Sequence, residues 1–122
     1  MSLSSLGQFA LPVVDVDRAE VFYGQVLGLR KLFRFDNLVF FDCAGVRLML
    51  EGEDAVEVSS GVCHYFRTQN IDATYAELLE NGAEFYEAPH LIVTMPDHEL
   101  WMAFFRDPDG HTLALMEERK LG

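Results

Sequence analysis

The sequence predicts an α+β fold of two tandem units, each containing one strand, one helix and three further strands. Two repeats support this prediction. The segment 45–50 (Gly-Val-Arg-Leu-Met-Leu) matches 110–115 (Gly-His-Thr-Leu-Ala-Leu), with the glycine and both leucines separated by the same 65 residues. The residues that open the two helices also match, because Asp15 and Asn70 lie 55 residues apart. A repeat that preserves several positions in order indicates a duplicated structural unit.

The first unit begins with a largely apolar segment, 8–14, which predicts a strand, and Pro12 indicates either an edge strand or the end of that strand. Asp17 and Glu20 have the spacing of a capping box, so we expect a helix to begin at Asp17. Gly28 is expected to end that helix. Three short strands are then expected at 30–35, 38–42 and 46–51.

The second unit repeats this order after an acidic segment of small residues, 53–60, which we interpret as a linker. Its first strand is expected at 61–69, and Asn70 opens a helix that ends at Asn81-Gly82. The remaining strands are expected at 84–93, 100–105 and 112–117. One unit could not bury both faces of its own sheet. Residues 1–122 are therefore predicted to form a single domain of units 6–52 and 61–118.

The composition disfavours several classes of function. The chain carries 20 acidic and 9 basic residues, which disfavours nucleic acid as a partner because its phosphates would be repelled. No apolar segment approaches the roughly 20 residues that a membrane-spanning helix needs, and the first residues lack the pattern of a signal peptide. Cys43 and Cys63 lie in apolar strand segments and form no disulfide framework, so we expect free thiols and a cytoplasmic location.

Three motifs connect the chain with a known family. Phe22-Tyr23 and Leu27-Gly28-Leu29 lie on the first helix and at its end, and 104–110 has the pattern Phe-x-x-Asp-Pro-Asp-Gly. With the duplicated unit, these motifs resemble the vicinal oxygen chelate superfamily, which includes glyoxalase I, the extradiol dioxygenases and the bleomycin-resistance proteins. The resemblance extends from Gln8 to Glu118. It implies an incomplete mixed β-barrel with helices outside, built around a ligand cavity, and a homodimer.

The resemblance also implies where a divalent metal ion would bind. Metal-dependent members use a His or Gln in the first strand, a Glu in the fourth, and the equivalent pair in the second unit. Counting seven residues back from Asp15 and six back from Asn70 assigns Gln8 and His64 to the first-strand positions, and the matched hairpins assign Met49 and Ala114 to the other two. Met49 offers only a thioether and Ala114 offers no ligand atom, so we expect no metal cofactor and no glyoxalase I activity by the usual route.

A shifted set of ligands keeps a metal enzyme as the alternative. Glu51 lies two residues beyond Met49 on the same strand face, and Glu118 lies on the strand face of Ala114. The complete shifted set would be Gln8, Glu51, His64 and Glu118, binding zinc, nickel, iron or manganese near the rim of the cavity. In this alternative the chain is a lyase or dioxygenase of the same superfamily.

The residues expected to line the cavity share the inward parity of their strands. Gln8 and His64 would anchor a polar group of the ligand, and His64 is the candidate catalytic residue. His90 lies just before the strand expected to cover the mouth of the barrel and could reach a ligand. The other expected ligand-binding residues are Arg47, Met49, Phe66, Ala114 and Met116.

A few polar groups among apolar walls suit a small-molecule site. The sequence therefore predicts a protein similar to the bleomycin-resistance type, which binds a small apolar or aromatic molecule without the usual metal site. The metal-dependent lyase or dioxygenase is the alternative, and a third interpretation is an interaction module whose barrel interior is filled by side chains. The sequence does not decide whether the protein catalyses a reaction, or whether one chain or two form the barrel.

Overall fold

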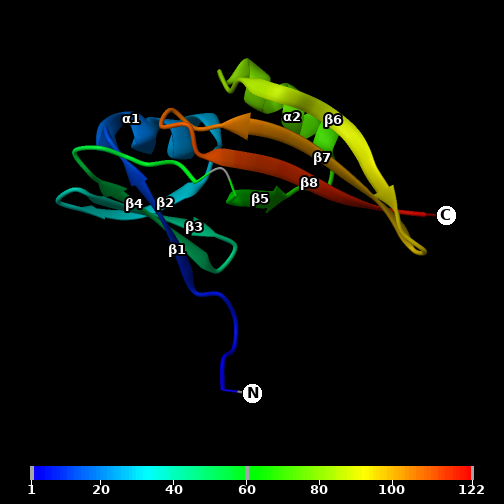
Figure 1. Ribbon diagram of the computed structural model, residues 1–122, viewed down its shortest axis with the longest axis horizontal. Coiled ribbons are helices and arrows are strands. Elements are labelled where there is room, and N and C mark those ends of the chain that lie inside the picture. Colours follow the sequence, from blue (N-terminus) through cyan, green and yellow to red (C-terminus); the bar gives the residue numbers. More distant parts are fainter. Residues whose placement is uncertain (1, 60, 122) are drawn as a thin grey trace. The chain divides into compact units, whose positions relative to one another are not determined.

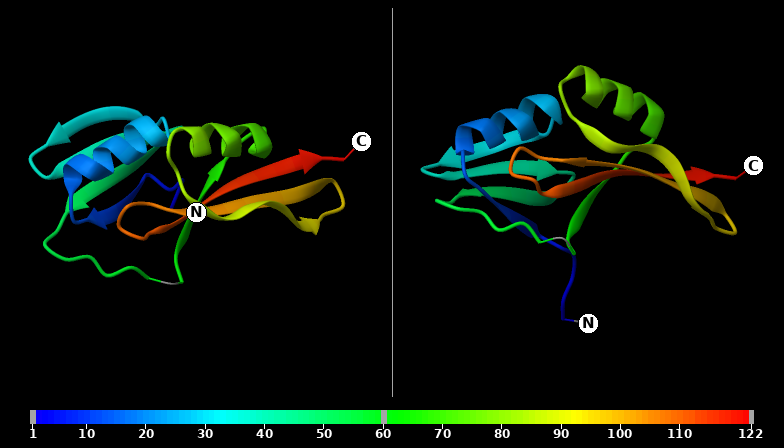
Figure 2. Two further views of the ribbon diagram at one scale, coloured as in Figure 1. Left: turned by 90° about the horizontal axis from the view of Figure 1, so that it is seen from above. Right: turned by 45° about the horizontal axis from the view of Figure 1, so that its top comes forward.

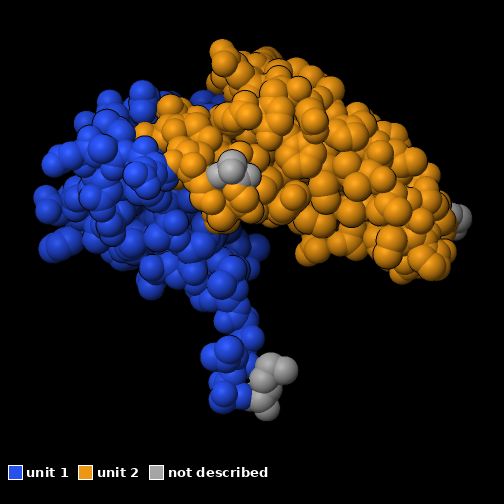
Figure 3. All heavy atoms as spheres, viewed as in Figure 1, with its two compact units in different colours: residues 1–57 blue, residues 58–122 orange. Residues whose placement is uncertain are grey.

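The computed structural model describes residues 2–59 and 61–121. Within them, eight strands form two four-stranded mixed sheets, and each sheet has a helical segment on one face (Figures 1 and 2). Backbone contacts divide the chain into two compact units, Met1–Glu57 and Val58–Gly122 (Figure 3). None of the helices in the described part of the chain has the length and apolar character needed to cross a membrane.

The first unit contains one sheet whose strands are β1 (Gln8–Val13), β2 (Arg30–Phe35), β3 (Leu38–Cys43) and β4 (Val46–Gly52). Their order in the sheet is β1-β4-β3-β2, in which β1 runs parallel to β4 and the other neighbours are antiparallel. Since β1 is an edge strand, Pro12 is accommodated there as the sequence predicts.

The N-cap of the helix in the first unit lies two residues earlier than the sequence indicates. The helix consists of α1 (Val16–Val21), which continues into a π-helical turn, η1 (Phe22–Val26). Asp15 is the N-cap, and its side chain accepts a hydrogen bond from the Arg18 N–H at 3.1 Å. The expectation that Asp17 caps the helix is therefore wrong. Asp17 lies in the first turn, where its carboxylate pairs with the Arg34 guanidinium at 2.6 Å.

The core of the first unit lies between α1 and the sheet, where α1 packs against β3 and β4. Buried side chains alternate along β1, β3 and β4 because only one face of the sheet is covered. They are Leu11 and Val13 of β1, Val39 and Phe41 of β3, Leu48 and Leu50 of β4, and Ala19, Phe22 and Tyr23 from the helix. Gly24 allows the close approach, since a Cβ there would lie 3.3 Å from the Phe41 ring.

The second unit repeats this architecture with β5 (Cys63–Arg67), β6 (Phe85–Thr94), β7 (His98–Arg106) and β8 (Thr112–Lys120). The sheet order is β5-β8-β7-β6, with β5 parallel to β8, so each strand has its counterpart in the first unit. Helix α2 (Ile71–Glu80) begins as predicted, because the Asn70 side chain accepts a hydrogen bond from the Ala73 N–H at 3.1 Å.

The core of the second unit lies between α2 and strands β6, β7 and β8. Its main apolar members are Ile71, Leu78, Ala103, Phe105, Leu113 and Leu115. A buried carboxylate, Glu117 of β8, accepts a hydrogen bond from the Ile71 N–H at 2.9 Å and so connects the sheet to the first turn of α2.

The predicted fold of two tandem units is confirmed, including the order of helix and strands in each. The two sheets are separate in the strand pairing of residues 2–59 and 61–121, so hydrogen bonds do not close them into a barrel. The expected strand bounds are close, although β7 and β8 extend further than predicted, to His98 and Lys120.

Candidate functional site

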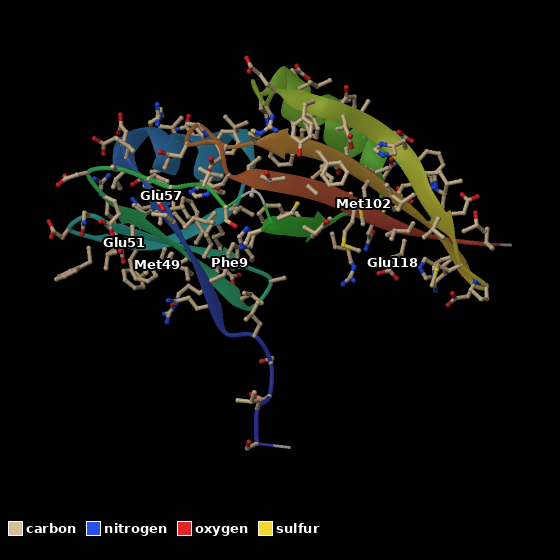
Figure 4. All side chains as sticks on the ribbon, in the orientation of Figure 1. Phe9, Met49, Glu51, Glu57, Met102 and Glu118 are labelled. Carbon is tan, nitrogen blue, oxygen red and sulfur yellow. The ribbon has the colours of Figure 1, made fainter. Side chains whose placement is uncertain are left out.

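Each sheet has one face covered by a helix, and we call the opposite face the open face of that unit. In the first unit, Leu48 and Leu50 of β4 are fully buried on the helix side. Arg47, Met49 and Glu51 alternate with them and therefore lie on the open face. Figure 4 shows Met49 and Glu51 on the side of β4 away from α1.

The pairing register arranges the open face of the first unit in three rows that cross the sheet, since directly paired residues lie side by side on one face. The polar row contains Gln8, Arg47, Asp42 and Arg30; the apolar row contains Ala10, Met49, Phe40 and Phe33; the third row contains Pro12, Glu51, Leu38 and Phe35. Charged groups are thus concentrated at one end of an apolar strip, with Glu51 at the other end.

Side-chain contacts join the members of the polar row in two pairs, Gln8 with Arg47 and Asp42 with Arg30. The Arg47 Nε–H donates to Gln8 Oε1 at 2.9 Å, and the Gln8 amide nitrogen approaches the Met49 sulfur at 3.9 Å. Asp42 accepts from the Gly45 N–H at 3.0 Å and pairs with Arg30 at 3.5 Å. Gln8 and Arg47, both predicted ligand-binding residues, are therefore brought into direct contact.

The apolar row presents aromatic surface beside this polar row. The Phe33 and Phe40 rings are stacked, with centroids 4.4 Å apart and planes inclined by 24°. The Arg47 guanidinium carbon lies 5.3 Å from the centroid of the Phe40 ring, which is a cation–π distance. Phe33 is 47% exposed, so this stack is partly open to a ligand.

The open face of the second unit is richer in aromatic and methionine side chains. Tyr65, Ala114 and Phe104 are cross-strand neighbours in one row, and Arg67, Met116, Met102 and His90 form the next. Figure 4 shows Met102 and Glu118 on the side of this sheet away from α2. Ala114 is fully buried even though it lies on the open face. It is a small residue paired directly with Tyr65 and Phe104.

Ring contacts connect this second open face across its strands. The Phe104 ring lies 6.3 Å from that of Tyr65, 6.2 Å from that of Tyr86 and 6.3 Å from that of His90. The Arg106 guanidinium lies 4.1 Å above the Tyr86 ring. Tyr65 and Tyr86 are both nearly half exposed, so this aromatic cluster also offers apolar surface to a small molecule.

His64 does not lie on the open face, and the expected parity of β5 is wrong by one residue. His64 pairs with Leu113 and Phe66 pairs with Leu115, both of which are buried on the helix side. Burial, followed by the nearby charge of His111, lowers the pKa of His64 below its usual value. The position equivalent to Gln8 is Cys63, which lies 55 residues later and pairs with Thr112 as Gln8 pairs with Arg47.

Cys63 brings a thiol to the open face of the second unit in place of the expected imidazole. Burial raises the pKa of this thiol above its usual value, although a hydrogen bond with Tyr65 acts in the opposite direction. The raised pKa favours the protonated thiol at neutral pH, so Cys63 is not activated as a nucleophile.

A family model and several solved structures match this chain. The model of the Glyoxalase/Bleomycin resistance protein/Dioxygenase superfamily matches residues 5–115. The chain belongs to this superfamily.

Solved structures of the superfamily share the fold over nearly the whole chain. A glyoxalase/bleomycin resistance protein/dioxygenase from Alicyclobacillus acidocaldarius is 23% identical with a TM-score of 0.77, covering 97% of this chain and 95% of that one. A superfamily member from Sphaerobacter thermophilus is 24% identical with a TM-score of 0.76, covering 97% and 100%. The lactoylglutathione lyase of Agrobacterium tumefaciens is 21% identical with a TM-score of 0.75, covering 96% of each chain. At such identities these likenesses describe the fold and do not assign an activity.

The shifted metal-ligand set, Gln8, Glu51, His64 and Glu118, does not fit a metal ion of the kind that superfamily enzymes use. Glu118 lies on the open face of the second sheet, whereas His64 lies on the helix side of the same sheet, so their side chains diverge. Within residues 2–59 and 61–121, no group of three or more His, Cys, Asp or Glu side chains is arranged to hold a metal ion. The neighbouring Glu51 carboxylate raises the pKa of Glu53.

Of the predicted ligand-binding residues, the structure places Gln8, Arg47 and Met49 on the first open face and His90, Ala114 and Met116 on the second. His64 and Phe66 lie on the helix side. The sequence interpretation missed the aromatic residues Phe33, Phe40 and Tyr65. Phe40 could have been found, since a hairpin that turns at Ala44-Gly45 pairs it with Met49.

Proposed function

We propose that this protein binds a small apolar or aromatic molecule on its open sheet faces, without the metal site that many members of its superfamily use. The observation that carries the proposal is the strip of aromatic and methionine side chains on each open face. On the first face, Met49 and the stacked Phe33 and Phe40 lie directly beside a hydrogen-bonded polar row. Apolar surface with a few fixed polar groups is the usual composition of a small-molecule site.

The energetic reason for binding is the apolar area that a ligand would remove from water. Phe33 and Phe35 are 47% and 71% exposed, and Tyr65 and Tyr86 are nearly half exposed. Fully burying a phenylalanine side chain stabilises by roughly 1.5–3 kcal/mol, so covering two half-exposed rings contributes on the order of 2 kcal/mol. A planar aromatic ligand adds stacking contacts to this.

The proposal is tested with neutral planar aromatic amides of one to three rings, including 2-naphthamide, added to amide NMR spectra of the intact chain. We expect saturable shifts of amides on β3 and β4 or on β7 and β8. Phe40→Ala should weaken binding to the first face at least fivefold and Phe104→Ala binding to the second. Leu79→Ala removes a side chain of α2 that is 43% exposed, and should change neither.

Two results would contradict the proposal. One is the absence of saturable binding of any of these amides at millimolar concentration. The other is binding that Phe40→Ala and Phe104→Ala leave unchanged. Thermal unfolding of each variant shows whether the fold is retained, so a loss of binding can be separated from a loss of structure.

The sequence predicts a homodimer and a cytoplasmic location, and both remain predictions that form part of this proposal. Light scattering after size-exclusion chromatography tests the first, because a homodimer has twice the 13.9 kDa mass of one chain. The acidic composition continues to disfavour nucleic acid as a partner.

A further inference from the structure

We infer that the ligand carries a carboxylate and that the Arg47 guanidinium, held by Gln8 beside the apolar row of Met49 and Phe40, binds it. This inference rests on the proposed function and adds the charge of the ligand and the residue that recognises it. It assigns to the first open face a small aromatic carboxylate, with its anion at the polar row and its ring on the apolar row.

The Arg47 guanidinium is oriented before any ligand arrives. Its Nε–H donates to Gln8 Oε1 at 2.9 Å, and its carbon lies 5.3 Å from the Phe40 centroid. These two contacts restrict the side chain from opposite sides. Within residues 2–59 and 61–121, the bond to Gln8 is the one hydrogen bond that the Arg47 side chain makes. Both terminal nitrogens of the guanidinium are therefore available as donors. Two parallel N–H groups match the two oxygens of a carboxylate.

The charges that face Arg47 leave a local excess of positive charge. Asp42 is its direct neighbour on β3, but the Asp42 carboxylate already accepts from the Gly45 N–H and pairs with Arg30. The polar row therefore holds two guanidinium groups and one carboxylate. The acidic net charge of the whole chain does not cancel this, because charges further away than about 8 Å are largely screened at physiological salt.

The geometry of the strand places the apolar row at the distance that a ring requires. Met49 follows Arg47 by two residues on β4, which corresponds to about 7 Å along the strand. An aromatic ring attached to a carboxylate spans a similar distance, so the ring would lie over Met49, Phe40 and Phe33. Glu51, at the far end of the same strand face, would repel a carboxylate there and so favours one orientation of the ligand.

The experiment compares 2-naphthoate with 2-naphthamide, which have the same rings and differ in charge. Dissociation constants are measured by calorimetry at 0.05 M and 0.5 M NaCl for the native chain, Arg47→Gln, Arg47→Lys, Gln8→Ala and Arg18→Gln. Arg18 is an exposed arginine of α1 in the same unit, so Arg18→Gln makes the same change of net charge away from the open face.

The native chain should bind 2-naphthoate about 10- to 100-fold more tightly than 2-naphthamide, because hydrogen bonds between charged groups contribute more free energy than hydrogen bonds to a neutral group. The ratio should be smaller at 0.5 M NaCl because salt screens the charges. Arg47→Gln should abolish the difference without changing the affinity for 2-naphthamide. Arg47→Lys should keep part of the difference, Gln8→Ala should reduce it, and Arg18→Gln should leave it intact.

The failures are distinguishable. Equal affinity of the native chain for both compounds overturns the carboxylate inference and leaves the proposed function standing. A preference for 2-naphthoate that persists in a folded Arg47→Gln variant overturns Arg47 as the anchor. If neither compound binds at millimolar concentration, the proposed function and this inference are both overturned.

Discussion

Replacing the buried carboxylate of Glu117 is the most informative test of how the second unit is stabilised. Glu117 is 7% exposed and accepts the Ile71 N–H at 2.9 Å, at the position where α2 begins. It also accepts from the Arg119 guanidinium at 3.2 Å and 3.3 Å. We expect Glu117→Gln to destabilise this unit while preserving its shape.

The size of the effect follows from the bonds that change. Glutamine can still accept from the Ile71 N–H, so a charge-assisted hydrogen bond becomes a neutral one, which costs about 1–2 kcal/mol. Glu117→Ala leaves the buried N–H without an acceptor and should cost about 3 kcal/mol. The hydrogen bond from Arg119, and then that from Ile71, lower the pKa of Glu117.

The lowered pKa gives the effect a defined pH dependence. Glu117 binds its proton less readily in the folded chain than in the unfolded chain, where the pKa of a glutamate is about 4.3. Its contribution to stability is therefore fully present above about pH 4.3 and is lost as the pH falls through the lower folded value. The difference between native chain and Glu117→Gln should be constant from pH 8 to pH 5 and shrink below pH 4.

Urea unfolding followed by tryptophan fluorescence is the appropriate assay. Trp101 is the single tryptophan and is paired directly with Glu117 across β7 and β8, so its emission reports on this unit. Glu118→Gln is the matched control, because the neighbouring carboxylate is 42% exposed and should contribute less than about 0.5 kcal/mol. Equal free energies of unfolding for Glu117→Gln and Glu118→Gln at pH 7 would refute the reasoning.

Four further predictions follow from individual contacts. Asn70→Ala removes the N-cap of α2 and should lower the free energy of unfolding by about 1 kcal/mol in the same fluorescence assay. Gly52→Ala places a Cβ 2.6 Å from Val16 Cγ2 and should destabilise by about 1–3 kcal/mol by circular dichroism. Because its pKa is raised, Cys63 should react with iodoacetamide more slowly at pH 8 than a thiol in an unfolded peptide. Because its pKa is lowered, His64 should titrate by NMR with a midpoint below 6.5.

Much of this architecture is readable from local sequence patterns. The hairpin segments 45–50 and 110–115 repeat because each unit needs a turn glycine followed by alternating apolar residues. Asn70 indicates the start of α2 because its side chain satisfies an amide that the helix leaves unpaired. In the first unit Asp15 and Asp17 both have capping chemistry. Asp15 caps the helix, and Asp17 pairs with Arg34 on β2, a partner that lies 17 residues away.

The candidate site depends on which face each residue of a strand occupies, and the sequence indicated this correctly for β4 and β8 but not for β5. The matched hairpins identified Met49 and Ala114 correctly as open-face residues, because the leucines on either side mark the helix side. For β5, counting six residues back from Asn70 selected His64, whereas the 55-residue offset of the helix-opening residues, applied to Gln8, reaches Cys63, which occupies the open face. Side chains alternate along a strand, so an error of one residue exchanges the two faces. The pairing of β5 with β8 decides between these two residues, because it places Cys63 opposite Thr112 and His64 opposite the buried Leu113, which are far away in the chain.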